Sequence, residues 1–263
     1  MAENHSVKRK RRASASYFSY SLNHLPADRE VERFLTMIKR SFFDYCSVDR
    51  SCLKPNKKLK TTLFRIIFKC KLFDLKYRGL KPCEYRAERF SARATVSFFN
   101  RLNLTFDLIK KDAHAFYNGD PSAKSVFEIV YSYTSFFAVF AYRIANLLNC
   151  LNVPFLPRKI AELSKSKSGV DIHPAALIGA GFCIDHGVGT VIGETTVIGK
   201  NVRLYHGVTL GAKNLNRARN HKNKKRHPTI GDNVIIYSGA VVLGGKTTVK
   251  SNSVVPCGAL IKD

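Results

Sequence analysis

The chain has 263 residues, of which 45% are hydrophobic and 24% charged, so it can bury a sizeable globular core. Lysine and arginine outnumber aspartate and glutamate by 44 to 19, and the charge of +25 predicts affinity for an anion: nucleic acid, a membrane surface or a phosphate-bearing small molecule. The longest uncharged apolar-rich run, 129–142, is shorter than the roughly 20 residues that span a bilayer. No signal peptide is visible, and seven cysteines without a CxxC motif argue against a disulfide scaffold or a cysteine-type zinc site. We therefore expect a cytoplasmic protein.

The first part of the chain predicts a basic tail followed by a helical domain. Residues 1–24 are basic and polar, with KRKRR at 8–12, and predict a flexible tail that is either solvated or an import or nucleic-acid signal. From 25 to 167 apolar residues recur at three- and four-residue steps, which indicates helices. Pro154 and Pro157 are expected to end the last long helix. The expected helices begin near Pro26 and cover 63–75, 84–116 and, after a break at 118–121, 122–150.

A different pattern covers 168–263, where a branched aliphatic residue recurs every six residues and is often followed by glycine. This period predicts a left-handed parallel β-helix of hexapeptide repeats, in which each face of a triangular coil turns one aliphatic side chain inward. The fold class is therefore α+β. The repeat is interrupted by a two-residue slip at 186–190 and by a long basic loop at 212–227. The inward positions are expected to be Ile172, Ile178, Ile184, Ile192, Ile198, Leu204, Leu210, Ile230, Ile236, Val242, Thr248, Val254 and Leu260.

The interruptions hold the residues suited to chemistry, because the interior of a β-helix is packed and dry. His186 is of interest because histidine as a residue type can take a proton from a hydroxyl; the alternative is a surface histidine in a turn. Asp171 lies fifteen residues earlier, close to one eighteen-residue coil, so it could stack beside His186 and orient it. Arg226 closes the basic loop and suits a carboxylate. The six lysines and arginines of 213–225 suit phosphates or simply keep the loop solvated.

The sequence resembles the serine acetyltransferases, a family of hexapeptide-repeat acyltransferases. The β-helix carries the resemblance in GVDIHPAALIG (169–179), DHGVGTVIGETTVIG (185–199), GVTLG (207–211) and RHPTIGDNVII (226–236). The helical part carries it in DAHAFYNGDPSA (112–123) and AYRIANLL (141–148), so that about residues 105–263 are covered. The chain departs from the family at Gly119, where an arginine is usual, and at Phe137, where a histidine is common.

The resemblance implies acetyl transfer from acetyl-CoA to the hydroxyl of L-serine, the first step of cysteine biosynthesis. It implies that His186 is the general base and that Asp171 orients it. No acyl-enzyme is required, so Cys183 is expected to be a bystander. The implied anchors of the substrate amino group are Asp120 and Asp185, and those of its carboxylate are Arg226 and His227.

In this family acetyl-CoA lies in a groove between neighbouring β-helices, which implies a homotrimer or a dimer of trimers. Ala212, Ser238 and Gly239 are the implied contacts of the pantetheine arm, and Lys246 or the loop lysines those of the phosphates. No metal and no membrane partner are expected. The family continues beyond the equivalent of Asp263 with a tail that docks into O-acetylserine sulfhydrylase, so we expect no tight complex with that enzyme.

Two other functions remain open at this point. A related O-acetyltransferase acting on a sugar or polysaccharide hydroxyl would share the β-helix, but many such enzymes lack the helical domain that carries Asp120. A basic, non-enzymatic nucleic-acid-binding module would explain the charge of +25. Against that module, the charges are spread along the chain and the His186–Asp171 pair is intact, so nucleic acid is not the expected partner.

Overall fold

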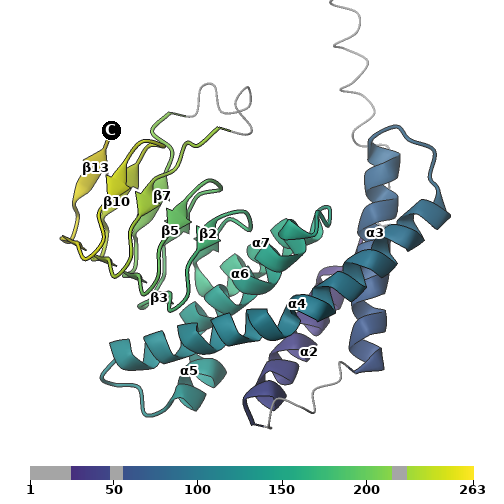
Figure 1. The fold of residues 1–263 in the computed structure, drawn as a ribbon, viewed down its shortest axis with the longest axis horizontal. Coiled ribbons are helices and arrows are strands. Elements are labelled where there is room, and N and C mark those ends of the chain that lie inside the picture. The colour runs from purple at the N-terminus through teal and green to yellow at the C-terminus, as the bar shows by residue number, and fades with distance from the viewer. Residues whose placement is uncertain (1–24, 48–55, 215–223) are drawn as a thin grey trace, which may run out of the picture.

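The computed structural model describes residues 25–47, 56–214 and 224–263, so the predicted tail at 1–24 and most of the basic loop lie outside the described residues. Helices come first and short strands follow (Figure 1). Within the described ranges no helix is both long and apolar enough to cross a membrane. The helices are α2 (Asp28–Ser47), α3 (Lys57–Tyr77), α4 (Glu84–Gly119), α5 (Val126–Ser132), α6 (Thr134–Cys150) and α7 (Leu156–Ser168).

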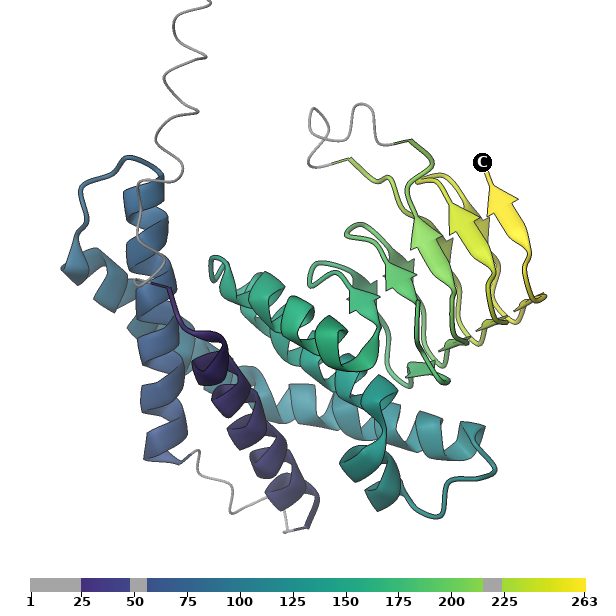
Figure 2. The ribbon, with the colours of Figure 1, turned by 180° about the vertical axis from the view of Figure 1, so that it is seen from behind.

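The helical part folds around one aromatic-rich core. In α2 the apolar stripe of the sequence is buried, including Phe34, Ile38 and Phe42. The ring of Phe42 lies 5.4 Å from that of Phe106 in α4 and 6.0 Å from that of Phe140 in α6, so α2 is joined to both helices. Figure 2 shows α2 and α3 on the side away from the strands, with α6 and α7 between them and the strands.

The prediction of a single long helix over 122–150 is wrong, because the chain forms α5 and α6 with a break at Tyr133. Ser125 caps α5 by accepting a hydrogen bond from the backbone N–H of Glu128 at 3.1 Å. Tyr133 has an extended backbone (φ −77°, ψ 119°) that ends α5. Apolar spacing continues across the break, so periodicity could not reveal it. Pro157 likewise does not end the helical region but lies in the first turn of α7, where a missing N–H costs nothing.

The strands form three parallel sheets, one on each face of a triangular coil, which confirms the predicted fold class of a helical part followed by a β-helix. The first sheet contains β1 (Asp171–Ile172), β4 (Val191–Ile192), β7 (Thr209–Gly211), β10 (Val241–Leu243) and β13 (Leu260–Lys262). The second contains β2 (Leu177–Ile178), β5 (Val197–Ile198), β8 (Thr229–Ile230) and β11 (Thr248–Val249). The third contains β3 (Cys183–Ile184), β6 (Arg203–Leu204), β9 (Ile235–Ile236) and β12 (Val254–Val255).

The predicted inward positions hold up to Val242 and fail in the last coil. Thr248 is exposed there, and Val254 and Leu260 are each 60% exposed. The neighbouring residues Val249 and Val255 are buried instead, and Ile261 is partly buried against the core. Val241 pairs with Leu260, so this coil has nineteen residues instead of eighteen. A shift by one residue moves a strand's side chains to the opposite face, which explains the error.

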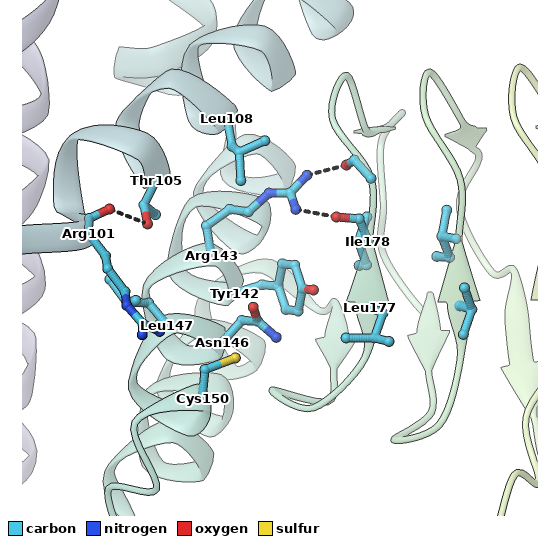
Figure 3. Close-up of a pocket in the computed structure, with 13 residues that line it drawn as sticks. Arg101, Thr105, Leu108, Tyr142, Arg143, Asn146, Leu147, Cys150, Leu177 and Ile178 are labelled. Atoms are coloured by element: carbon cyan, nitrogen blue, oxygen red, sulfur yellow. Dashed lines mark hydrogen bonds between the residues drawn. The ribbon is translucent and has the colours of Figure 1, made fainter. Parts of the chain in front are cut away.

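A buried ion pair joins the helical part to the first coil of the β-helix. The Arg143 guanidinium donates to both carboxylate oxygens of Asp112, from Nε at 2.8 Å and from Nη2 at 3.0 Å. Arg143 also donates to the carbonyl oxygens of Ile178 (2.6 Å) and Gly179 (2.5 Å), as Figure 3 shows at the edge of a pocket between α4, α6 and the strands. Asp112 in turn accepts from the backbone N–H of Phe182 at 2.9 Å. The helices are therefore held in a fixed relation to the β-helix.

Candidate active site

His186 occupies the turn between β3 and β4, where the sequence repeat slips by two residues. Its side chain is 75% exposed, and its backbone has φ +56°, an uncommon conformation for a residue other than glycine. The imidazole Nε2 lies 3.8 Å from Oδ1 of Asp185, and the ring centroid lies 5.9 Å from that of His206. The histidine is thus presented to solvent on a constrained turn, as a group that exchanges protons with a bound molecule would be.

Asp171 lies at the start of β1 and is held by cations of α7. Its carboxylate accepts a hydrogen bond from Lys165 Nζ at 2.8 Å and lies 3.9 Å from Arg158 Nη1. Asp171 pairs with Val191, so the first coil has twenty residues and not the eighteen that the spacing argument assumed. Within the described part of this chain, the carboxylate within 4 Å of His186 is therefore that of Asp185, not Asp171.

Asp120 follows the last turn of α4 and presents an ionised carboxylate. Oδ1 accepts from the backbone N–H (2.9 Å) and the hydroxyl (2.6 Å) of Ser122, and Oδ2 accepts from the hydroxyl of Tyr133 at 2.6 Å. These bonds hold the pKa of Asp120 below its ordinary value, and the charge of His186 adds to the effect. No ion pair joins a described lysine or arginine to this carboxylate, so its charge is free to meet a cationic group.

Arg226 and His227 lie against the residues that follow β4. Arg226 forms an ion pair with Glu194, and its Nη1 is buried without a hydrogen-bond partner among the described residues. The His227 Nδ1 accepts from the backbone N–H of Thr195 at 3.0 Å. Burial, and then the charge of Arg226, lower the pKa of His227 to about 4, so this ring is neutral at physiological pH. Glu194 was not predicted as a site residue, and only its place two residues after the repeat position Ile192 could have drawn attention to it.

The structure divides the predicted substrate residues between two edges of the first sheet. Asp185 and His186 come just before β4, and Asp120 lies near them. His227 packs against Gly193 just after β4, where a Cβ on that glycine would lie 2.0 Å from the ring. The sheet therefore separates the predicted base and amino-group anchors from the predicted carboxylate anchors within one chain.

The residues predicted to contact acetyl-CoA are divided in the same way. Ser238 and Gly239 follow β9 on the His186 edge; the Ser238 hydroxyl lies 3.1 Å from Cys257 Sγ, and the space where a Gly239 Cβ would lie is open. Ala212 and Lys246 lie on the opposite edge. There, a hollow of about 390 Å³ is lined by Lys213, Arg226 and Lys246, together with Asp263, whose carboxylate accepts from the backbone N–H of Lys246 at 3.1 Å. Such a concentration of cations suits phosphate groups.

Two departures of the sequence acquire a structural account. The guanidinium of Arg203, from β6, occupies the space beside Gly119, where a Cβ would lie 1.9 Å from Nη2, and it donates to the Gly119 carbonyl at 2.7 Å. A side chain at position 119 would therefore collide with the Arg203 guanidinium, which accounts for the glycine in this chain. Phe137 packs against the apolar core. Cys183 is buried, and burial raises the pKa of its thiol to about 12, which makes it unreactive.

Known proteins similar to this chain identify its family. No protein-family model matches the chain. It is 42% identical over 156 residues to the serine acetyltransferase of Bacillus subtilis, covering 69% of that protein. It is 44% identical over 167 residues to the plasmid-encoded serine acetyltransferase of Synechococcus elongatus, of which it spans about half (52%). The chain belongs to the serine acetyltransferase family.

A solved structure extends the likeness to nearly the whole chain. Serine acetyltransferase isoform 3 of Entamoeba histolytica, determined in complex with cysteine, superposes with a TM-score of 0.69. It shares 30% identity, and the match covers 97% of this chain and 88% of that one. A serine acetyltransferase is an acyltransferase that uses acetyl-CoA, so the family confirms the class of enzyme and of co-substrate expected from the sequence. Among the described residues there is no group of three side chains that could ligate a metal ion.

Proposed function

We propose that this chain transfers the acetyl group of acetyl-CoA to the hydroxyl of L-serine, giving O-acetyl-L-serine and CoA. The observation that carries the proposal is the ionised Asp120 carboxylate, which forms no ion pair with a described lysine or arginine and lies close enough to the exposed His186 for their charges to interact. The ammonium group of an amino-acid acceptor would neutralise Asp120, and its hydroxyl would present a proton to His186. A sugar has no ammonium group to offer, so the geometry favours the amino acid.

In the proposed reaction His186 removes the serine hydroxyl proton while the oxygen attacks the thioester carbonyl. The tetrahedral intermediate collapses by breaking the C–S bond, and the protonated imidazole returns its proton to the leaving CoA thiolate. The Asp185 carboxylate, whose Oδ1 lies 3.8 Å from the imidazole Nε2, faces the charge that develops on the ring during this transfer. Asp171 could assume the orienting role only if its carboxylate, which accepts from Lys165 through Oδ2, also reached His186.

We propose further that a complete site needs a second copy of the chain. The ammonium and hydroxyl anchors lie on one edge of the first sheet, and Arg226 and His227 on the other. In a trimer of β-helices, the His186 edge of one subunit faces the Arg226 edge of its neighbour, and the serine carboxylate bridges to that arginine. Acetyl-CoA would lie along the same groove, with Ser238 and Gly239 on one wall and Ala212 and Lys246 on the other.

The Entamoeba relative supports an amino-acid site of this kind. It was determined with cysteine bound, and cysteine has the same ammonium and carboxylate groups as serine, with a thiol in place of the hydroxyl. Anchors that recognise both charged groups of a zwitterion accept either molecule. We therefore propose that cysteine competes with serine for Asp120 and Arg226 in this chain as well.

The decisive experiment measures thiol release from acetyl-CoA in the presence of single acceptors. L-Serine should support turnover, whereas L-alanine, which lacks the hydroxyl, should not. Robust turnover with a sugar and none with serine would instead support an O-acetyltransferase that acts on a sugar or polysaccharide hydroxyl. Mixing an inactive His186→Ala protein with an Arg226→Ala protein, assayed at a serine concentration well below the raised KM of the latter, tests the shared site, because mixed trimers would contain some sites with both residues intact. Failure to regain activity after verified subunit exchange would place both residues in one chain's site.

A further inference from the structure

The turn that carries Asp120 is held by residues outside the predicted catalytic set. It lies between α4 and α5, and its backbone is fixed from the β-helix, because Arg203 Nη1 donates to the Gly119 carbonyl at 2.7 Å. The Asp120 side chain is fixed from the other side by Tyr133, at the break between α5 and α6, whose hydroxyl donates to Oδ2 at 2.6 Å. The break in the helix is thus also the place from which the carboxylate is held.

The hydrogen bonds on Asp120 define which direction remains available to a ligand. An ionised carboxylate has about four lone-pair sites. Ser122 occupies two of them through its N–H and hydroxyl, and Tyr133 occupies a third. About one acceptor position is left, and it belongs to the same oxygen that Tyr133 holds. The Tyr133 hydroxyl therefore decides where the free position points.

The hydrogen bond between Tyr133 and Asp120 shifts the pKa of both residues. The bond to Asp120 raises the pKa of Tyr133, and the same bond helps to lower the pKa of Asp120. Tyr133 therefore remains a donor and Asp120 remains an anion throughout the physiological range. A bond between a neutral donor and an ionised acceptor is roughly twice as strong as one between neutral groups.

We propose that Tyr133 is a positioning residue for the acetyl transfer, whose hydroxyl aims the free acceptor site of Asp120 at the ammonium group of the acceptor. The inference rests on the proposed function and deepens it, because it assigns recognition of the acceptor's amino group to a contact between the α4–α5 turn and the break between α5 and α6. Tyr133 does not touch the substrate; it acts through Asp120. The residue should consequently control the preference for amino acids over hydroxy acids that lack the amine.

The test compares Tyr133→Phe, which removes only the hydroxyl, with Tyr131→Phe as a matched control. Tyr131 lies in α5, two residues before the break, but it is 69% exposed and its ring stacks on that of Phe127. Tyr133→Phe should raise KM for L-serine about tenfold, equivalent to about 1.4 kcal/mol, and leave KM for acetyl-CoA and kcat within twofold. Activity toward 3-hydroxypropanoate, which lacks the amine, should not change, so the preference for serine falls about tenfold. The control should leave all of these values unchanged.

A double variant separates positioning from general damage to the fold. In an Asp120→Asn background, Tyr133→Phe should change KM for serine less than twofold, because the anchor it serves has lost its charge. A tenfold effect that persists in this background, or an equal loss with 3-hydroxypropanoate, overturns the proposal. Calorimetric titration of L-serine without acetyl-CoA gives the same comparison without chemistry. Binding without turnover would refute the proposed function while Kd still tests Tyr133, and a wild-type protein that neither binds nor acetylates serine would overturn both.

Discussion

Replacing Arg143 by methionine should destabilise the protein strongly, because it isolates a buried charge. Asp112 is fully buried and the Arg143 side chain is 5% exposed. Arg143→Met keeps much of the side-chain volume but leaves the Asp112 carboxylate with only backbone donors, such as the N–H of Phe182. It also removes the donor to the carbonyls of Ile178 and Gly179.

The expected loss of unfolding free energy is about 4 kcal/mol, since breaking a buried ion pair by removing one partner costs about 3–5 kcal/mol. Adding Asp112→Asn removes the stranded charge while keeping an acceptor for Phe182, so the double variant should lose only about 2 kcal/mol. The matched control is Lys165→Met, which breaks the partly exposed pair with Asp171 and should cost at most about 1 kcal/mol.

Urea unfolding followed by circular dichroism, with all variants at one protein concentration, measures these differences. The Arg143→Met deficit should also depend on pH. Burial raises the pKa of Asp112, and the guanidinium of Arg143 is the charged group that opposes this shift, so removing it leaves the shift unopposed by charge among the described residues. The folded variant then keeps a proton that the unfolded chain releases above about pH 4, so its stability falls as pH rises and the deficit is larger at pH 8 than at pH 5. A loss below 1 kcal/mol, or a double variant no better than the single one, would refute this reasoning.

Three further outcomes are expected. His186→Ala should lower kcat by roughly 10²–10⁴, the usual contribution of a positioned general base, and an active variant would exclude the mechanism. Arg226→Ala should raise KM for serine roughly tenfold or more, while KM for acetyl-CoA changes less. Lys224→Ala, in the same loop, serves as the control. Equal changes in both KM values would mean that Arg226 has only a structural role. Because the pKa of His227 is lowered to about 4, the unfolded chain takes up a proton near pH 6.5 that the folded ring refuses until about pH 4. Stability should therefore fall as pH drops through this window, and His227→Gln should show less of this fall in urea unfolding; identical profiles would contradict the assignment.

The residues of the repeat were enough to predict the β-helix, because every coil repeats the same pattern of one aliphatic residue in six. An aliphatic residue every six positions has one geometric solution, and an error at one position leaves the others unaffected. The candidate base could be found for a related reason: His186 breaks a regular pattern, and the motifs around it resemble one family. Fold class and enzyme class are local or repeated properties of the sequence, and the comparisons with known proteins confirm both.

Other features depend on contacts between distant segments, and only the tertiary structure decided them. One extra residue in the last coil exchanged Val254 for Val255 in the interior, because alternation carries no record of absolute register. The spacing within one repeat cannot specify two of the contacts. Lys165 reaches Asp171 from a helix that precedes the first strand, and Arg203 reaches Gly119 across 84 residues of sequence. The division of the predicted site between two edges of one sheet has the same origin: sequence motifs identify which residues are present, whereas the coil determines which way each one faces.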